Sequence, residues 1–488
     1  MKQHWRGKVA CLAGALAVCP LLAAPLCAAR LAYTEPYLVG PAPSTGMYVC
    51  WLTREPAAGS YVQYGATAGF GQREPAVTHE MQGFRTVDAL GKYTAPLKVY
   101  QQIVHLAKLT PGTRYYYRAV TVSGADSERT PGYDFKTAPR PGTPIKAVLL
   151  SDLQLMKGIP ASVRIAGQQG ADLIIYNGDM ANVTYRAGEW FTLPGTPEED
   201  GKRWFNVLQQ TTGGARLLQY VPIYPSPGNH EVDDQEAVTV KALASRGRMS
   251  LSVYMQLFRP LYPEQGYRAG GKHWYSADYA DLHIVSLSLL RWFAWPASEA
   301  PGWPIYDPIR QGSPQYEWLA ADLRAAAGRG YIWVTQHWHM FNRSVDVKVP
   351  FTDPVPGQGD AAGTVTYPAG EDYLLRDVKP LYEKYGVNGV SFGHSHVYEH
   401  YRVNGISYIE AASIGNTYRN ASDPPCSPNT GACPEFEETR FRSIMVVDID
   451  PARGISARGI QTSVEPGGTG AVGRVFDTFT ITDKPARK

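Results

Sequence analysis

Side chains that commonly bind metal ions follow apolar, strand-like runs at several places in this 488-residue chain. Six of them stand at or just after the end of such a run: Asp152, Asp179, Asn229, His337, His394 and His396. In open α/β sheets, ligands bind in the crevice beyond the carboxyl ends of the strands. The sequence therefore predicts a layered α/β domain in which these six side chains converge on one site.

Glycine directly precedes three of these side chains, in Gly178-Asp179, Gly228-Asn229-His230-Glu231 and Gly393-His394-Ser395-His396. Glycine permits tight turns and a close approach of two backbone segments, which a convergent site requires. Residues two apart on an extended backbone point to the same side, so His394 and His396 are expected to face one point. Two neutral imidazoles on one side favour a transition-metal ion.

The sequence pattern between residues 31 and 138 is different. Short strand-like runs are separated by turn residues and no long helix is indicated, which is typical of a β-sandwich. The expected strands are Met47–Thr53, Ser60–Gly65, Val99–Leu106, Arg114–Val122 and Tyr133–Thr137. The turn and strand over Leu109–Tyr117 resemble those of a fibronectin type III module, so we expect such a sandwich over residues 31–140.

The Pro-rich segment Ala138–Pro144 predicts a stiff linker between this sandwich and the rest of the chain. After it, strands and helices alternate, which predicts an α/β domain over residues 145–488. Helices are expected over Gln315–Ala327, from its apolar spacing, and over Tyr373–Tyr385.

The N-terminus has the order of an export signal. The cations Lys2, Arg6 and Lys8 precede the apolar run Val9–Cys27, and small residues follow it at Ala28-Ala29. We therefore expect residues 1–29 to be a cleaved signal peptide and the mature protein to be periplasmic or secreted. A lipid anchor on Cys19 is the alternative. No later segment has the length and apolar character of a transmembrane helix.

The cysteines indicate the cellular compartment, and the charge balance limits the kinds of binding partner. Cys426 and Cys433 flank a short Pro/Gly/Asn loop, which predicts a local disulfide in an oxidising compartment, with two unpaired thiols as the alternative. Cys50 lies in an apolar run and is expected to be a buried thiol. Lys and Arg number 47 against 44 Asp and Glu, a balance that argues against a dedicated nucleic-acid binder.

The ordered motifs, from Asp152 through Gly393-His394-Ser395-His396, resemble the signature of the calcineurin-like metallophosphoesterases. Val397-Tyr398-Glu399, Trp274-Tyr275-Ser276 and the preceding sandwich are more narrowly similar to the purple acid phosphatases. This resemblance implies a layered αββα metallophosphoesterase domain preceded by an all-β, fibronectin type III-like sandwich. It also implies metal-dependent hydrolysis of phosphate esters.

The resemblance implies a role for each matching residue. Asp152 and His396 would hold one metal ion, while Asn229, His337 and His394 would hold a second. Asp179 would bridge the two ions, and His230 would contact the phosphate and protonate the leaving oxygen. The implied cofactors are two ions of Fe, Zn or Mn, with a bridging hydroxide as nucleophile.

Some positions depart from the purple enzymes. Asn182 replaces the tyrosine that binds ferric iron there, and Tyr185 lies three residues too late, so a coloured tyrosinate centre is not expected. Gln154 stands two residues after Asp152 and could offer an amide oxygen to the first metal or line the pocket. His400 replaces an arginine. His339 is a candidate for phosphate contact or proton transfer, with packing beside Trp338 as the alternative. Gln154, Asn182 and His339 are thus candidate substrate-binding residues.

Three functions remain open at this stage. A phosphomonoesterase is favoured, a phosphodiesterase acting on nucleotides or lipid headgroups is the second, and a catalytically inactive extracellular binding protein is the third. The long loops Asn182–Asp200 and Ser344–Glu371 are expected to form the rim of the pocket. The expected partner is a small phosphorylated substrate, and no oligomeric state is predicted.

Overall fold

A computed structural model describes residues 30–87, 93–154, 159–194, 196, 203–209, 214–232, 251–262, 272–289, 309–341, 373–411, 425–427, 431–438, 441–464 and 470–482. The predicted signal segment 1–29, the loop Ser344–Glu371 and part of the loop Asn182–Asp200 lie outside these residues. The chain divides at Arg30, and the fold below is that of Leu31–Lys488.

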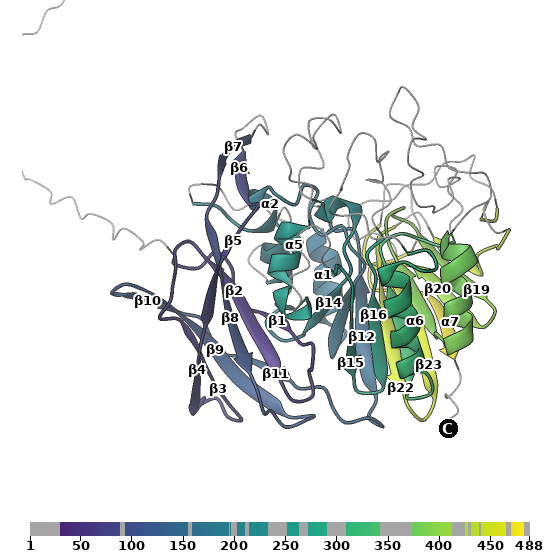
Figure 1. Ribbon diagram of the computed structural model, residues 1–488, viewed down its shortest axis with the longest axis horizontal. Helices are drawn as coiled ribbons and strands as arrows, with labels where there is room; N and C mark the ends of the chain where they lie inside the picture. The colour runs from purple at the N-terminus through teal and green to yellow at the C-terminus, as the bar shows by residue number, and fades with distance from the viewer. Residues whose placement is uncertain are drawn as a thin grey trace, which may run out of the picture. The chain divides into compact units, whose positions relative to one another are not determined.

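The first part of this unit consists of antiparallel strands (Figure 1). They are β1 (Tyr37–Val39), β2 (Met47–Thr53), β3 (Tyr61–Gly65), β4 (Gln72–Pro75), β5 (Val77–Met81), β6 (Arg85–Val87), β7 (Tyr93–Pro96), β8 (Val99–Leu106), β9 (Arg114–Ser123), β10 (Asp126–Arg129) and β11 (Tyr133–Lys136). One sheet has the order β1-β2-β8-β5, the other has β10-β9-β3-β4 with β11 paired to β9, and β6 pairs with β7 as a hairpin. The five strands predicted here are confirmed, β2 and β8 to the residue.

The second part contains two larger sheets. Their strands are β12 (Ile145–Leu150), β13 (Leu173–Tyr176), β14 (Ile223–Pro225), β15 (Tyr275–Tyr279), β16 (Leu282–Ser286), β17 (Tyr331–Thr335), β18 (Gly389–Phe392), β19 (Tyr398–Val403), β20 (Ile406–Glu410), β21 (Phe436–Glu438), β22 (Ser443–Asp450), β23 (Gly454–Gln461) and β24 (Val475–Thr482). One sheet has the order β14-β13-β12-β22-β23-β24, and the other has the order β15-β16-β17-β18-β20-β19-β21.

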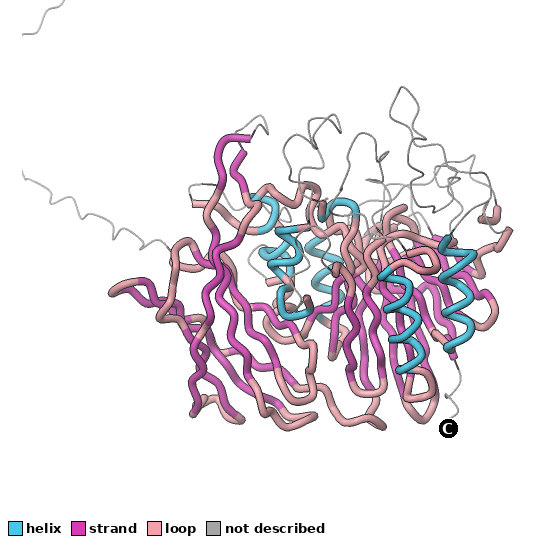
Figure 2. The backbone as a smooth tube through the Cα atoms, viewed as in Figure 1, coloured by secondary structure: helices cyan, strands magenta, loops and turns pink. Residues whose placement is uncertain are grey.

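Helices accompany these sheets (Figure 2). They are α1 (Ile159–Gly167), α2 (Ala187–Trp190), α3 (Trp204–Leu208), η1 (Asn229–Glu231), α5 (Ser252–Leu257), η2 (Arg259–Leu261), α6 (Pro314–Ala326), η5 (Leu374–Val378) and α7 (Lys379–Tyr385). Both predicted helices are present. α6 begins where the Ser313 side chain accepts the Tyr316 N–H, and α7 ends at Gly386, whose φ is 72°.

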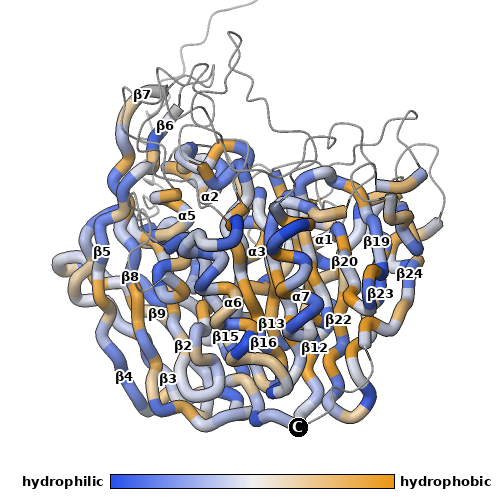
Figure 3. The backbone as a smooth tube through the Cα atoms, turned by 45° about the vertical axis from the view of Figure 1, so that its right-hand side comes forward, coloured by the Kyte–Doolittle hydropathy of each residue, from blue (hydrophilic) through white to orange (hydrophobic). Residues whose placement is uncertain are grey.

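Alternation along β17 shows why the domain is layered. Tyr331 and Trp333 join the core that contains β12 and β22, whereas Ile332 and Val334 join a second core with α6 and α7. Both faces of the strand are therefore buried. The central strands around β13, β16 and β22 are largely coloured as hydrophobic in Figure 3. Burying each such side chain contributes about 1.5–3 kcal/mol. The predicted fold class, an all-β sandwich followed by a layered αββα domain, is confirmed.

The sandwich packs against the layered part. The Tyr37 hydroxyl donates to the Leu257 carbonyl at 2.8 Å, and the Leu38 N–H donates to the Leu218 carbonyl at 3.0 Å. Both sandwich and sheet residues contribute to one continuous core. The division into domains at 31–140 and 145–488 remains a prediction.

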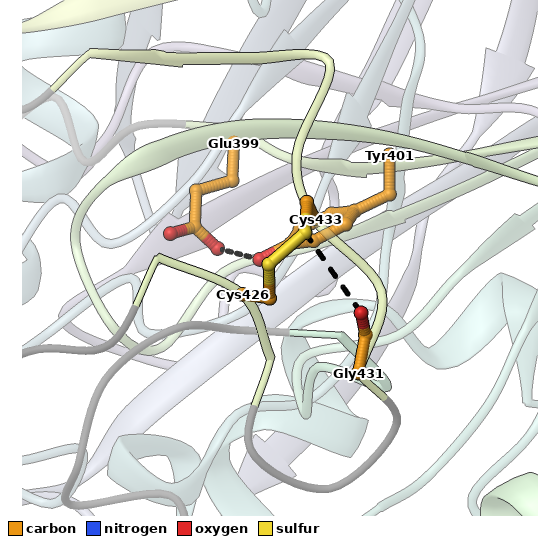
Figure 4. Close-up of a disulfide and its surroundings, with 5 residues drawn as sticks. All are labelled: Glu399, Tyr401, Cys426, Gly431 and Cys433. Carbon is orange, nitrogen blue, oxygen red and sulfur yellow. Dashed lines mark hydrogen bonds between the residues drawn. A yellow bond between two sulfur atoms is a disulfide. The ribbon is translucent and has the colours of Figure 1, made fainter.

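The cysteine predictions agree with the structure. Cys426 and Cys433 form a disulfide beside the Glu399–Tyr401 hydrogen bond (Figure 4). Cys50 is a free, fully buried thiol, and burial raises its pKa. Among the described residues, no helix combines the length and apolar character needed to cross a membrane.

Candidate metal centre

Five strand ends meet at one edge of the two sheets. β12, β13 and β14 are parallel neighbours, as are β17 and β18, so their carboxyl ends lie on the same side. The six predicted residues follow these ends: Asp152 after β12, Asp179 after β13, Asn229 after β14, His337 after β17, and His394 and His396 after β18. The structure brings all six together.

Asn177 ties the edges of the two sheets together. Its side-chain Oδ1 accepts hydrogen bonds from the hydroxyls of Thr335 and Ser391, both at 2.8 Å. Its backbone carbonyl accepts from His337 Nδ1 at 2.6 Å. These partners lie in the other sheet, so this one buried amide holds the two groups of strand ends at a fixed separation.

Glycine is required where the strand ends approach each other. Gly178 has φ 83°, and a Cβ on it would lie 2.7 Å from both His337 Nδ1 and the Gly228 nitrogen. A Cβ on Gly228 would overlap the Asp179 carboxylate, and one on Gly393 would overlap that of Asp152. The close backbone approach expected from the sequence is therefore present.

The backbone is left-handed at several of these positions. Asp152, Asp179, His394 and His396 have φ values of 51°, 56°, 82° and 60°, and Gln154 has φ 31°. Such conformations cost non-glycine residues about 1–3 kcal/mol each and persist only when surrounding contacts enforce them. Strain of this kind is characteristic of a functional site.

The metal-competent atoms form two groups that share one carboxylate. Asp179, His337 and His394 offer ligand atoms within 4.8 Å of one another, and so do Asp152, Asp179 and His396. Asn229 Oδ1 lies 3.0 Å from both His337 Nε2 and His394 Nδ1. Mixed imidazole and carboxylate ligands suit Zn, Fe or Mn.

The atoms that surround the two ring nitrogens of His337 show whether a metal ion would fit between them. Because Nδ1 donates to the Asn177 carbonyl, Nε2 of the neutral ring presents a lone pair. That nitrogen faces Asp179 Oδ2 at 3.1 Å, Asn229 Oδ1 at 3.0 Å and His394 Nδ1 at 3.3 Å. A single proton cannot bond all of these atoms, whereas a metal ion accepts several lone pairs at once. The residues therefore fit a metal ion.

The charges in this cluster compensate one another. Burial opposes charge on His337, but the Asp179 carboxylate raises the pKa of its ring to about 10. Burial likewise disfavours the Asp179 anion, yet the imidazoles of His337 and His230 hold its pKa well below the usual range. Burial and the neighbouring His337 and His339 hold the pKa of His394 well below its ordinary value. Without an ion, the pocket thus holds an anionic Asp179, a protonated His337 and a neutral His394, and a bound metal ion would take the place of the proton on His337 Nε2.

Comparison with known families agrees with this geometry. Residues 34–137 match the model of the purple acid phosphatase N-terminal domain. Residues 145–398, more than half of the chain, match that of the calcineurin-like phosphoesterases. The chain belongs to the calcineurin-like phosphoesterase family. Within it, the paired domains make this a purple acid phosphatase-like metallophosphoesterase, whose family centre is dinuclear.

Individual relatives are distant. Purple acid phosphatase 21 of Arabidopsis thaliana is 24% identical over 245 residues, which cover 49% of this chain and 44% of the relative. The purple acid phosphatase PPD1 of yellow lupin (Lupinus luteus) superposes with a TM-score of 0.61 at 17% identity, over 93% of this chain and 74% of that one. The structure of PhoD gives 0.55 at 14% identity, over 93% and 91%. These structural likenesses show a shared fold.

His230 lies beside the centre of this metallophosphoesterase. Its backbone N–H donates to Asp179 Oδ1 at 2.9 Å, and its ring Nδ1 donates to the Asn182 carbonyl at 2.7 Å. Nε2 is then 3.9 Å from Asp179 Oδ2, and the side chain is 22% exposed. The ring therefore reaches the edge of the group of candidate ligands while remaining open to solvent.

The other candidate residues surround the cluster differently. The Gln154 amide donates to Asp179 Oδ2 at 2.8 Å, so it contacts the shared carboxylate. His339 is buried and stacks on Trp338, with its ring 5.7 Å from that of His394. Asn182 contributes its carbonyl to His230, while its side chain is exposed.

Two residues singled out for their family positions lie outside the cluster. Tyr185 is buried beneath the Arg85 guanidinium, which lies 5.3 Å from its ring. His400 is buried and stacks on Phe479, and burial lowers its pKa to about 4. The aromatic residues Trp190 and Phe191, of the same loop as Tyr185, pack in the core.

Glu231 is a residue of this site to which sequence reasoning assigned no role. Its buried carboxylate accepts the backbone N–H groups of Gly228 at 2.7 Å, Asp179 at 2.8 Å and Met180 at 2.8 Å. Burial and the Asp179 charge raise its pKa to about 7. Its place in the Gly228–Glu231 motif was visible, but its partners near Asp179 are some fifty residues away.

Proposed function

We propose that the chain is a metal-dependent phosphoric ester hydrolase whose substrates are phosphate monoesters. The observation that carries this proposal is the position of Asp179 in both metal-competent groups. One carboxylate that bridges two ligand groups is suited to a pair of ions and not to a single structural ion. The family shown by the sequence supports the same chemistry.

The ligands divide between the two ions as the groups do. Asp152 and His396 would hold one ion, Asn229, His337 and His394 the other, and Asp179 both. Two ions of Fe, Zn or Mn would supply a hydroxide nucleophile at neutral pH and neutralise charge on the phosphoryl oxygens. Asn177 and Glu231 keep the ligand loops in place through the hydrogen bonds described above.

His230 is assigned the proton transfer. With both ring nitrogens protonated, Nδ1 remains bonded to the Asn182 carbonyl while Nε2 donates its proton to the ester oxygen as the P–O bond breaks. Water supplies the oxygen that joins phosphorus, and the alcohol leaves with the proton from His230. The exposed fraction of the ring leaves room for a leaving group beside it.

Export to the periplasm or medium belongs to the same proposal. The order of charges and apolar residues over 1–29 supports a signal peptide. The Cys426–Cys433 disulfide supports an oxidising compartment. The mature enzyme would then comprise the sandwich over 31–140 and the catalytic domain over 145–488.

The test compares a chromogenic phosphate monoester with the corresponding diester. Purified mature protein is stripped of metal by chelation, and turnover is measured before and after Mn, Zn or Fe is restored. We expect metal-dependent turnover, with kcat/KM for the monoester at least about tenfold that for the diester. A diester preference would instead indicate a phosphodiesterase. No turnover of either ester with any metal would leave an inactive binding protein.

A further inference from the structure

The segment that holds His230 is itself anchored to the β-sandwich. We propose that the sandwich is a positioning device for His230, acting through the segment Asn182–Phe191. This inference rests on the proposed function, because it assigns to the sandwich a part in the proton transfer made by His230. The contacts run without a break from the sandwich to the imidazole.

The first step is between His230 and the start of the segment. The carbonyl of Asn182 accepts the Nδ1–H of His230 at 2.7 Å, which fixes the orientation of the ring and turns Nε2 toward Asp179. The Asn182 N–H and the Val183 N–H both donate to Glu189 Oε2 at 2.8 Å. Glu189 therefore sets the position of the peptide group that orients the imidazole.

The second step is the folding of the segment on itself. Glu189 lies in α2 (Ala187–Trp190), and Trp190 Nε1 donates to the Thr184 carbonyl at 2.7 Å. The Arg186 guanidinium lies 3.6 Å from Glu189 Oε1. These bonds make one compact unit of the turn and the helix, so movement of α2 would also move Asn182.

The third step joins this unit to the sandwich. Phe191, which ends α2, stacks on Tyr33 with ring centroids 4.5 Å apart and meets Phe84 edge-on at 5.4 Å. The Arg85 N–H donates to the Tyr185 carbonyl at 2.8 Å. Phe84 is 1% exposed and immediately precedes β6. The sandwich thus contacts the segment at two points. Aromatic rings pack against Phe191, and a backbone hydrogen bond joins Arg85 to Tyr185.

General acid catalysis gives this arrangement a distinctive kinetic signature. A poor leaving group, such as the alkoxide of glycerol phosphate, needs a proton as the P–O bond breaks, whereas p-nitrophenolate needs little help. His230→Ala should therefore reduce kcat for glycerol phosphate by about 10²–10⁴-fold and that for p-nitrophenyl phosphate much less. A misplaced His230 should show a weaker form of the same selectivity.

The test compares Phe84→Leu with Phe135→Leu. Both phenylalanines lie in the sandwich and are 1% exposed, but Phe135 packs against Tyr115 and Tyr117, within the sandwich. We expect Phe84→Leu to lower kcat for glycerol phosphate about tenfold and that for p-nitrophenyl phosphate less than about twofold. Phe135→Leu should leave the ratio of the two rates unchanged.

Two further measurements separate positioning from general loss of structure. Adding Phe84→Leu to His230→Ala should cause no further selective loss, because the group it positions is already absent. Hydrogen exchange at the Asn182 and Val183 amides should be faster in Phe84→Leu than in Phe135→Leu, with or without metal. Glu189→Gln, which leaves the sandwich untouched, should show the same leaving-group selectivity.

Equal losses on both substrates in Phe84→Leu and Glu189→Gln, or unchanged exchange at both amides, would overturn the inference while leaving the proposed function standing. A wild-type protein with no metal-dependent turnover would instead contradict the proposed function. The two failures are therefore distinguishable.

Discussion

His337 and His283, two histidines of the second domain, each lie beside carboxylates, but the remaining partners of their ring nitrogens differ. His283 Nδ1 donates to Asp278 at 2.7 Å and Nε2 donates to Asp322 at 2.9 Å, so one protonated ring satisfies both carboxylates. His337 Nδ1 donates a hydrogen bond to a backbone carbonyl. Its Nε2 faces a carboxylate, an amide oxygen and a second imidazole. A proton completes the first arrangement, whereas the second calls for a multivalent cation.

The backbone conformation also differs between the surroundings of His283 and those of His337. His283 and Asp278 face each other in regular antiparallel register between β15 and β16. Beside His337, by contrast, Asp179 and His394 follow strand ends in left-handed conformations. A histidine between carboxylates therefore indicates a metal site only where additional lone pairs converge and the backbone is held in strained conformations around it.

The largest expected difference is between Asp179→Asn and Asp322→Asn. Each change neutralises the aspartate beside one of the two histidines. Asp179→Asn should reduce kcat for a phosphate monoester by at least about 10³-fold, because the shared ligand of both ions is lost. Asp322→Asn should leave kcat within about twofold. Steady-state assays at saturating metal measure both, and equal losses would mean that the two regions do not differ as described.

Substitutions at two glycines compare the stability cost of a Cβ inside the site with its cost at an open turn. Gly178 and Gly328 both have positive φ, 83° and 74°, but a Cβ on Gly328 meets nothing within 4 Å. Gly178→Ala should lower the free energy of unfolding by about 3 kcal/mol or more, since conformational strain and steric overlap both contribute. Gly328→Ala should cost about 1 kcal/mol, from strain alone. Denaturant titrations compare them, and equal costs would argue against close packing at the strand ends.

The smallest effect is expected from His283, and it depends on pH. Burial opposes its charge, but hydrogen bonds to Asp278 and Asp322 raise its pKa to about 9. A pKa raised in the folded state stabilises fully below the unfolded value near 6.5, and the stabilisation is lost as pH rises through 9. His283→Asn should therefore lower the free energy of unfolding by about 1–2 kcal/mol at pH 6, after allowance for solvent screening. Near pH 10 the difference should shrink towards zero. A difference that does not change with pH would show that His283 is not protonated in the fold.

Much of the site could be predicted because its residues carry local signals. Asp152, Asp179 and His337 follow apolar runs, and the carboxyl ends of neighbouring parallel strands meet at one edge of a sheet. Glycine before Asp179 and before Asn229 signalled close approach, which the structure explains by overlap with any Cβ.

Other features could not be predicted, because their partners are distant along the chain. Asn177 links Thr335 and Ser391, and Arg85 meets Tyr185, yet no local pattern announces either contact. The left-handed backbone at His394 follows from tertiary contacts and not from residue preference. Short elements such as the paired strands β6 and β7 lack the length that makes periodicity visible.

The most direct test of a two-ion centre sharing Asp179 is the metal content of four purified proteins by mass spectrometry. The account predicts two ions per chain in the wild type, one each in Asp152→Ala and His337→Ala, and none or a small fraction in Asp179→Ala. A wild type with one ion or fewer after metal loading, or an Asp179→Ala protein that keeps both, would contradict it.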